Sequence, residues 1–483
     1  MRCHRQKRYK YAVIQRLEIV LRASSEQPVK MTIDLYYSPS GPPSRMVLLL
    51  GKDLGLNFNL KRISVRDKEH MTPEFLKINP QHCIPTIVDN GFSHWESRAI
   101  ITYLASQYGK DDSLYPKDLK KRAIVDQRLY FDIATFFPGI RQYFKIQIDG
   151  GKPDAEDITK FENVYEVLDK ILEGQEWVAG SNITVADYSI VVSVSCTEAM
   201  GYDISKYHNV ARWFSKAKKT MVGFSEIEGK GNEEMKKMIE ARIAERKSVI
   251  QGLETVVGTS SEQLFKMTID LYYAPASPPC RIVMLLGKDL GLNFNLKSIS
   301  VRDKENMTPE FLKINPQHCI PTIVDNGLNL WESRAIITYL ASQYGKDDSL
   351  YPKDLKKRAL VDQRLYFDIG TLFPGIRQYF IKQIDGGKPD AEDITKFENV
   401  YELLDKFLEG QEWVAGSNIT VADYSIVVSV SITEAMGYDI SKYHNVARWF
   451  SKAKKTMVGF SEIEGKGNEE MKKMIQARIA EQK

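Results

Sequence analysis

The chain has 483 residues, of which 43% are hydrophobic and 27% charged. At roughly 100 to 200 residues per domain this is about three or four domains, each able to bury a core, which excludes a disordered or fibrous protein. The formal net charge is +4, but residues 1–30 carry eight basic and two acidic groups, so residues 31–483 have a net charge of −2. Such a body lacks the basic surface of a nucleic-acid-binding protein.

No apolar run approaches the roughly 18 residues that a membrane span requires. The basic start of the chain is like a signal peptide, but Arg16 and Glu18 interrupt its apolar region; an arginine-rich mitochondrial leader is the alternative. The odd number of cysteines suits a reducing compartment, and their spacing is not that of a metal site. They are Cys3, Cys83, Cys196, Cys280 and Cys319. We therefore expect a cytosolic protein with no metal, no membrane and no nucleic-acid partner.

The chain is a tandem duplication of one unit. A shift of 236 residues aligns Met31–Lys247 with Met267–Lys483 without a gap, with 21 differences in 217 positions. We call these the first and the second module. The repeat continues upstream, where Ser24–Gln27 recurs as Ser260–Gln263. We therefore predict that residues 1–30 are a disordered basic leader and that 248–266 are a linker.

The predicted elements of the second module divide it into two halves. Apolar and aromatic residues at strand and helix spacing predict, in order, a strand at Thr268–Tyr273, a helix at Arg281–Leu290, strands at Asn293–Ser300 and Ile320–Val324, and a helix at Ser333–Gln343. After the polar connector Gly345–Ser349 only helical patterns follow, among them Arg358–Tyr379, Ala391–Glu409 and Val421–Met436. The predicted fold class is α/β plus all-α, with domains at 31–110, 117–247, 267–346 and 353–483.

One helix start is explicit in the sequence. Thr420 can cap the helix that begins at Val421, and Asp423 can complete a capping box, with Ile419 and Tyr424 as a hydrophobic staple. The first module repeats this pattern. We interpret it as structural.

Three segments of the second module carry candidate chemistry. Ser277 precedes Pro278 at a helix start, where a hydroxyl caps the helix and an anion is stabilised, although most such serines are only caps. Ile320-Pro321 stands at a strand entrance, where a cis peptide bond can expose backbone groups. Glu332-Ser333 opens a helix and can bind an α-amino acid, its carboxylate on N–H groups and its ammonium on the glutamate.

In combination these segments resemble the glutathione transferases, most closely the insect delta class. The resemblance rests on the serine loop, on Asn315–Pro321 and on Trp331–Ile336, and it covers nearly all of both modules. It extends to Gln363–Asp368 and to the Thr420 box. The implied fold is a thioredoxin-like domain followed by an all-helical domain, and the implied co-substrate is glutathione.

The resemblance implies a role for each segment. Ser277 would donate a hydrogen bond to the glutathione sulfur and lower the pKa of its thiol, and the thiolate would attack an electrophilic carbon. The glutathione-binding residues implied for the second module are His318, Cys319, Ile320, Pro321, Glu332, Ser333 and Arg334. Those implied for the first are His70, His82, Cys83, Ile84, Pro85, Glu96, Ser97 and Arg98.

A hydrophobic pocket for the electrophile is expected between the two halves of each module. The candidates are aromatic residues and a proline whose alternative role is ordinary core packing: Pro279, Phe373, Tyr379, Phe380, Phe137, Tyr143 and Phe144. Asp368 and Asp132 match an active-site aspartate of the family, or are equally well explained as carboxylates in a buried network.

The first module departs from the second at the loop where the glutathione thiol is expected to bind, Tyr36–Arg45 in the first module and Tyr272–Arg281 in the second, which we call the thiol loop. Gly41 stands opposite Ser277, and six of the 21 differences fall within eleven residues of this loop. Ser40, one residue earlier, is a candidate replacement because Gly41 makes the backbone permissive. We expect glutathione still to bind here, at a weakened or nearly inactive site. In the second module Asn306 stands opposite His70, which is expected to weaken binding rather than chemistry.

We therefore expect a glutathione S-transferase that conjugates glutathione to hydrophobic electrophiles in detoxification, with the second module as the main catalyst. One alternative is a binding protein for glutathione or lipophiles that has no turnover. Another is thiol–disulfide exchange at Cys280, which we interpret rather as a small buried residue. Because family members form dimers, the modules are expected to pair within one chain or between chains.

Overall fold

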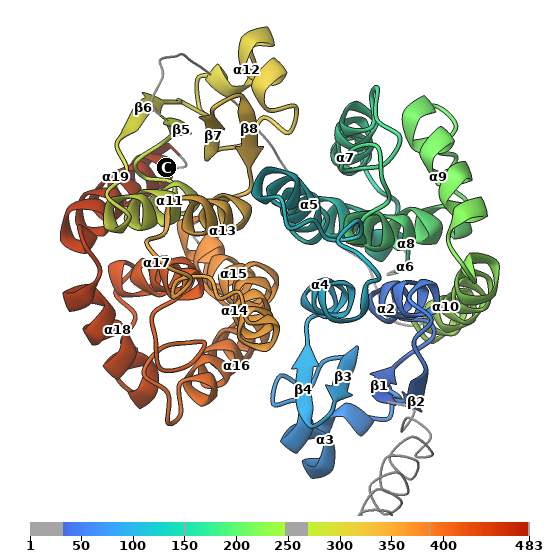
Figure 1. Cartoon of the computed structure of the whole chain (residues 1–483). Helices are drawn as coiled ribbons and strands as arrows, with labels where there is room; N and C mark the ends of the chain where they lie inside the picture. Colours follow the sequence, from blue (N-terminus) through green and yellow to red (C-terminus); the bar gives the residue numbers. More distant parts are fainter. Residues whose placement is uncertain (1–31, 149–150, 247–268, 386, 482–483) are drawn as a thin grey trace, which may run out of the picture.

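The protein is described by a computed structural model that places residues 32–148, 151–246, 269–385 and 387–481 (Figure 1). The predicted leader, residues 1–30, and the whole of the predicted linker, residues 248–266, lie outside these residues. Each module consists of an α/β domain followed by a helical domain, so the predicted fold class is confirmed.

The α/β domain of the first module contains β1 (Ile33–Tyr37), α2 (Pro42–Asp53), β2 (Phe58–Arg62), η1 (Glu69–Met71), α3 (Pro73–Ile78), β3 (Thr86–Asp89), β4 (Phe92–Trp95) and α4 (Ser97–Tyr108). Its helical domain contains α5 (Leu119–Phe131), the π-helical turn η2 (Asp132–Phe136), α6 (Phe137–Ile148), α7 (Ala155–Ile171), α8 (Val185–Ala199), α9 (His208–Thr220) and α10 (Phe224–Arg246).

The second module repeats this order. Its α/β domain contains β5 (Ile269–Tyr273), α11 (Pro278–Asp289), β6 (Phe294–Ser298), η3 (Glu305–Met307), α12 (Pro309–Ile314), β7 (Thr322–Asp325), β8 (Leu328–Trp331) and α13 (Ser333–Tyr344). Its helical domain contains α14 (Leu355–Phe367), η4 (Asp368–Leu372), α15 (Phe373–Ile384), α16 (Ala391–Phe407), α17 (Val421–Ala435), α18 (His444–Thr456), η5 (Ser461–Gly465) and α19 (Lys466–Glu481).

Most of the predicted elements are present, with shifted ends. The helix expected at Arg281–Leu290 begins earlier, at Pro278, because proline fits the first position of a helix. Ser277 is the residue before it, but its hydroxyl makes no capping hydrogen bond to the helix, so the expected side-chain cap is absent. The helix expected over Arg358–Tyr379 is interrupted by the π-helical turn η4. The capping box is confirmed, since the Asp423 carboxylate accepts hydrogen bonds from the backbone N–H and the hydroxyl of Thr420, at 2.8 and 3.0 Å.

Each module has a four-stranded sheet, in the order β2-β1-β3-β4 and β6-β5-β7-β8. The central strands β1 and β5 pair in parallel with β2 and β6 and antiparallel with β3 and β7. The loop after the central strand leads directly into α2 or α11. The sheet therefore places the thiol loop next to the entrance of β3 or β7.

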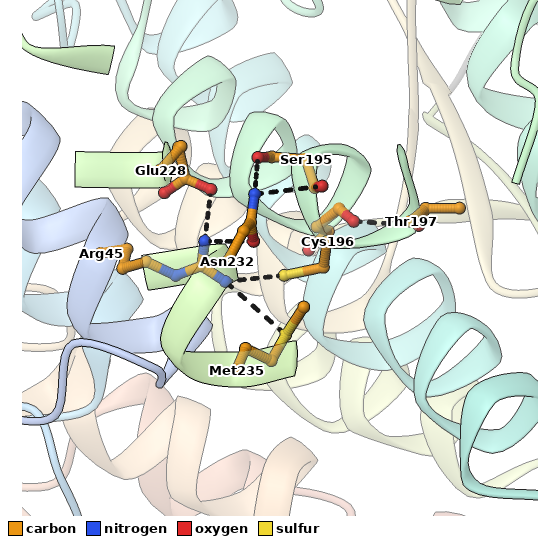
Figure 2. Close-up of polar contacts among 8 residues, drawn as sticks. Arg45, Ser195, Cys196, Thr197, Glu228, Asn232 and Met235 are labelled. Atoms are coloured by element: carbon orange, nitrogen blue, oxygen red, sulfur yellow. Dashed lines mark hydrogen bonds and ion pairs between the residues drawn. The ribbon is translucent and has the colours of Figure 1, made fainter. Parts of the chain in front are cut away.

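Buried arginines at the start of α2 and α11 tie these helices to the helical domain. Arg45 donates to Glu228 at 2.7 Å and to Asn232 at 2.6 Å, both on α10 (Figure 2). Arg281 makes the same bonds to Glu464 and Asn468. A Cβ on Gly231 would lie 2.3 Å from Cδ of Arg45, so only glycine leaves room for this arginine.

The two modules pack against each other through α4, α5, α13 and α14, which lie together in the middle of the molecule (Figure 1). Tyr130 and Tyr366 stack across the interface with ring centroids 4.8 Å apart. Gln363 donates to Nδ1 of the fully buried His94 at 3.1 Å, and Trp95 lies beside Phe407.

The interface also buries two carboxylates. Tyr351 donates to Asp362 at 2.8 Å, and Tyr115 donates to Asp126 at 2.7 Å. Burial, together with the charge of Asp126, raises the pKa of Asp362 to about 7. Burial raises the pKa of Asp126 to about 6. Ionisation of both Asp126 and Asp362 therefore destabilises the packing of the two modules against each other.

Replacing Asp362 by Asn should remove part of this pH dependence. Because the pKa of Asp362 is raised in the folded state, the folded chain binds more protons than the unfolded chain between about pH 4 and 7, and stability falls as the pH rises through this window. We expect the free energy of unfolding of Asp362→Asn relative to wild type to increase from pH 5 to 7, by at most about 1.4 kcal/mol per pH unit, and to level off above about pH 7. The increase is measured as a growing difference in Tm. The exposed Glu173→Gln is the control, and a gain that is the same at every pH would contradict the prediction.

Candidate functional site

The thiol loop of the second module ends at Ser277, the residue that precedes α11. Its backbone is extended, with φ −77° and ψ 115°. Cys280, one turn further on, is fully buried, and burial raises the pKa of its thiol to about 11, against a hydrogen bond with Ser277 and the charge of Arg281, which lower it. A thiol in this state is a poor nucleophile for disulfide exchange.

The loop of the first module has the same backbone but different hydroxyls. Gly41 precedes α2 with φ −79° and ψ 113°. The hydroxyls of Ser40 and Ser38 lie 3.1 Å apart, within hydrogen-bond distance of each other. Ser44, which replaces Cys280, accepts a hydrogen bond from the Ser38 N–H at 3.2 Å. The hydroxyl of Ser40 is thus engaged within the loop.

The second segment has the backbone that the sequence suggested. Ile84-Pro85 and Ile320-Pro321 are both cis. Asn315 holds the turn before the proline by donating to the Cys319 carbonyl and to the Thr322 hydroxyl, each at 2.9 Å. Burial raises the pKa of Cys319 well above its usual range. Cys83 has the same surroundings in the first module.

The third segment begins with a glutamate in an unusual backbone conformation. Glu332 has φ 67° and ψ 105°, and Glu96 has nearly the same angles. Such a conformation costs about 1–3 kcal/mol and is typical of functional sites. The side-chain amide of Gln317 links Glu332 to its neighbour Trp331. It donates a hydrogen bond to the Glu332 carboxylate at 2.7 Å and accepts one from the Trp331 indole N–H at 2.9 Å. Burial raises the pKa of Glu332.

A buried ion pair stabilises the start of helix α13. Arg334 donates to Asp368 at 2.6 Å and to the Ser333 hydroxyl at 3.1 Å. The Asp368 carboxylate also accepts from Ser425 and, at 2.8 Å, from Ser429. Arg98 and Asp132 form the same pair in the first module. Of the two explanations for Asp132 and Asp368, the geometry favours the buried network.

The histidine segments differ between the modules. The rings of His70 and His82 lie 6.1 Å apart, and burial together with the His82 charge lowers the pKa of His70. In the second module Asn306 stands at the position of His70, and its side-chain amide donates a hydrogen bond to the His318 carbonyl at 2.6 Å. An amide bound to the backbone thus replaces the His70 ring. Burial lowers the pKa of His318, and Lys170 of the first module adds to this effect.

The first module therefore contributes to the surroundings of the second module's site. Besides Lys170, Thr135 on η2 accepts a hydrogen bond from Gln317 at 3.2 Å. Neither residue could be identified from the sequence, because no local pattern marks a contact between modules. The supporting role of Gln81 and Gln317 was not predicted either, although both residues occur in the Asn-Pro-Gln-His motif.

A cleft of about 1180 Å³ lies between the modules and joins many predicted residues of the first one. The predicted residues that line it are Cys83, Ile84, Pro85, Glu96, Ser97, Arg98 and Phe137 of the first module and Phe373 of the second. Of the described residues, no group of three or more histidines, cysteines or acids could hold a metal ion. Nor is any described helix long and apolar enough to cross a membrane.

A second, apolar cavity of about 230 Å³ lies inside the first module. Phe137 and Phe144 line it together with Cys196, Met200 and others. Tyr143 is not among its lining residues and stacks on Phe161, with centroids 4.1 Å apart. Its counterpart Tyr379 stacks on Phe397 in the same way. Phe380 is buried beside Tyr379, and Pro279 is in the first turn of α11.

Family models match both modules in the same order. Models of the glutathione S-transferase N-terminal domain match residues 41–107 and 271–348. A model of the glutathione S-transferase C-terminal domain matches residues 133–218 and 371–454.

Solved structures of insect enzymes are similar to about one module's length of this chain. A delta-class glutathione transferase of Nilaparvata lugens is 49% identical, with a TM-score of 0.42, covering 44% of this chain and 99% of its own. A Bombyx mori glutathione transferase is 46% identical (TM-score 0.42; 44% and 98%). A housefly epsilon-class enzyme is 37% identical (TM-score 0.41; 44% and 98%). From the matched domains, which cover more than half of the sequence, the chain belongs to the glutathione S-transferase family, with both domains of that family present twice.

Proposed function

We propose that this chain is a glutathione transferase of the insect delta class in which the second module is the main catalyst. The observation that carries the proposal is the difference at one position. Ser277 and Gly41 have the same backbone angles at the start of equivalent helices, but only Ser277 has a hydroxyl. The framework that would hold glutathione is present in both modules.

The proposed reaction begins with ionisation of the glutathione thiol. The Ser277 hydroxyl donates a hydrogen bond to the sulfur, and the N-terminus of α11 stabilises the negative charge. Both effects lower the thiol pKa from about 8.5, so that more thiolate is present near neutral pH. The thiolate then attacks the electrophilic carbon and the leaving group departs with the electron pair.

The other segments would orient the tripeptide. The backbone of Ile320 binds the cysteinyl unit, Glu332 and Ser333 bind the γ-glutamyl end, and His318 binds the glycyl carboxylate. Arg334 acts on Ser333 rather than on glutathione, through the hydrogen bond described above. Holding the reactants in this way lowers the entropic cost of the reaction.

The second substrate would be a hydrophobic electrophile, and the role detoxification in the cytosol. The apolar cavity beside Phe137 and Phe144 supports a pocket of this kind in the first module. Because the hydroxyl of Ser40 is engaged with Ser38, we propose that the first module binds glutathione but conjugates it slowly.

Replacing Ser277 by Ala should lower conjugation of a halogenated nitroaromatic by about tenfold or more at pH 6.5, because each unit of thiol pKa changes the thiolate fraction tenfold. The pH profile of kcat/KM should shift to higher pH. Ser40→Ala is the matched variant and should change the rate by less than about twofold, the size of a minor hydrogen bond. An unchanged rate for Ser277→Ala would contradict the proposal.

Replacing Gly41 by Ser should raise turnover per chain. A Cβ at this position would approach the Ser38 carbonyl oxygen at 3.4 Å and the Ser44 hydroxyl at 3.6 Å, so serine fits without displacing a neighbour. Gly41→Ala is the control, since it adds the methyl group without the hydroxyl. Turnover should be measured in the Ser277→Ala background, and an equal gain in both variants would show that the hydroxyl is not the missing group.

The modules should pair within one chain. The interface through α4, α5, α13 and α14 supports an internal pair, which should give a particle of about the chain mass of 55.3 kDa in solution. Analytical ultracentrifugation between low and high micromolar concentration measures this. A particle of twice that mass at all concentrations would favour exchange of modules between chains.

A further inference from the structure

The surfaces that the two modules present to each other differ in sequence. Strand β4 packs on α14 of the second module, and β8 packs on α5 of the first. We call these contacts the β4 half and the β8 half of the interface. Five of the 21 differences between the modules fall on these strands, on these helices or at the ends of α7 and α16. Given as first and second module, they are Phe92 and Leu328, Ser93 and Asn329, His94 and Leu330, Ile124 and Leu360, and Ile171 and Phe407.

In the β4 half, two of these residues belong to a closed ring of contacts across the interface. Gln363 donates to the fully buried His94 at 3.1 Å, and its side-chain oxygen accepts a hydrogen bond from Arg364. The Arg364 guanidinium stacks on the Phe407 ring, 3.7 Å from the centroid. Phe407 in turn lies beside Trp95, the residue after His94, with ring centroids 6.4 Å apart. The polar strand residue and the aromatic helix residue are thus parts of one set of contacts.

In the β8 half, the same helix residues have other partners. Gln127 donates to the Trp331 backbone carbonyl at 3.5 Å, because Leu330 offers no acceptor. Arg128 crosses the interface to the Trp331 ring, 5.3 Å from its centroid, since Ile171 supplies no ring for it to stack on. The closed ring of the β4 half is therefore absent from this half.

The lysines at the start of α5 and α14 differ in the same way. Lys356 lies over the Phe92 ring, 5.5 Å from its centroid. Its counterpart Lys120 donates to the Asn326 carbonyl at 3.2 Å, because Leu328 has no ring. The lysine, glutamine and arginine of these helices are identical in the two modules. The substituted residues opposite them therefore determine which contacts form.

The substitutions also compensate for each other in size. The β4 half combines the smaller His94 with the larger Phe407, and the β8 half combines Leu330 with Ile171. A pair of two first modules would combine His94 with Ile171 and leave space unfilled. A pair of two second modules would combine Leu330 with Phe407, which overfills the contact and removes the acceptor of Gln363. Both kinds of misfit cost stability, and two-fold symmetry would repeat each misfit in both halves.

We propose that this interface selects the unlike module as its partner, so that the first module pairs with the second in preference to another copy of itself. The determinants are the substituted residues of β4 and β8 together with those at the ends of α7 and α16. The surface of the first module therefore fits a second module, from the same chain or from another copy of it. Because pairing requires neither glutathione nor an electrophile, the inference stands apart from the proposed function.

The first test is a double-mutant cycle in the full chain. The strand exchange Phe92→Leu, Ser93→Asn and His94→Leu gives β4 the residues of β8, and the helix exchange Leu360→Ile and Phe407→Ile gives α14 and α16 those of α5 and α7. Each exchange alone should lower Tm by about 2–4 °C. The joint variant has two matched halves of the β8 type and should return to within about 1 °C of wild type. A joint loss equal to the sum of the two single losses would overturn the proposal.

The matched control combines the strand exchange in β4 with Ile124→Leu and Ile171→Phe, which alter the β8 half. These changes do not meet across the interface, so their effects on Tm should add. A recovery of Tm in this control as well would contradict the proposal. Circular dichroism shows whether each variant is folded, and a single exchange that unfolds the chain but is rescued in the joint variant supports the proposal.

The second test measures the choice of partner directly. Unlabelled and isotope-labelled chains are cut at a protease site placed within residues 248–266, which leaves all described residues intact. The cut chains are mixed and incubated until labelled and unlabelled modules have exchanged, and native mass spectrometry counts the pairs. Random exchange puts like modules in half of all pairs, whereas wild type should give less than about a tenth.

The joint variant calibrates this assay, because its two halves are alike and its like-module pairs should reach about half of the total. A wild-type share of like-module pairs above about a tenth would overturn the proposal. Exclusion of like-module pairs in the joint variant would also overturn it, since the selectivity would then lie in residues other than those named.

Discussion

The ion pair between Arg334 and Asp368, with its copy at Arg98 and Asp132, is the contact on which the site's geometry depends. Both partners are almost completely buried, with 3% and 0% of their surface exposed. Removing one partner of such a pair leaves an uncompensated charge and typically costs about 3–5 kcal/mol. Asp368 accepts hydrogen bonds from Ser425 and Ser429 as well, so its charge is fully satisfied.

This pair joins the two halves of a module at the start of α13, where the γ-glutamyl end of glutathione is proposed to bind. Arg334 is the second residue of α13, and Asp368 begins the π-helical turn η4 in the helical domain. Two residues before Arg334, Glu332 is held in its strained conformation between Gln317 and the helix. The helical domain therefore helps to fix the conformation of the proposed glutathione site, whose candidate residues Ile320, Glu332 and Ser333 belong to the α/β domain.

Local signals in the sequence were sufficient for much of the fold. Ser277-Pro278 and the Thr420 box act within one helical turn, and the structure has helices beginning at both. Strand β8 was not predicted, although the Asn326-Gly327 turn before it, with φ of 48° and 80°, is a hairpin signal.

What the sequence could not provide was contact between distant residues. The π-helical turn η4 lies in a continuous apolar stripe that reads as one helix. The roles of Gln317, Thr135 and Lys170 depend on how strands and modules pack, which no local pattern encodes. The candidate residues were identified through their motifs, whereas the residues that support them required the structure.

The pairing of unlike modules has an evolutionary consequence. In a symmetric homodimer every interface substitution occurs twice, so a change must be compatible with both of its surroundings. Here His94 faces Gln363, whereas its counterpart is Leu330, and Phe407 lies beside Trp95, whereas its counterpart is Ile171. When the two copies are joined in one polypeptide, each module can accumulate interface substitutions independently. A substitution then has to be compatible with only one partner surface, because it occurs once in the interface rather than twice.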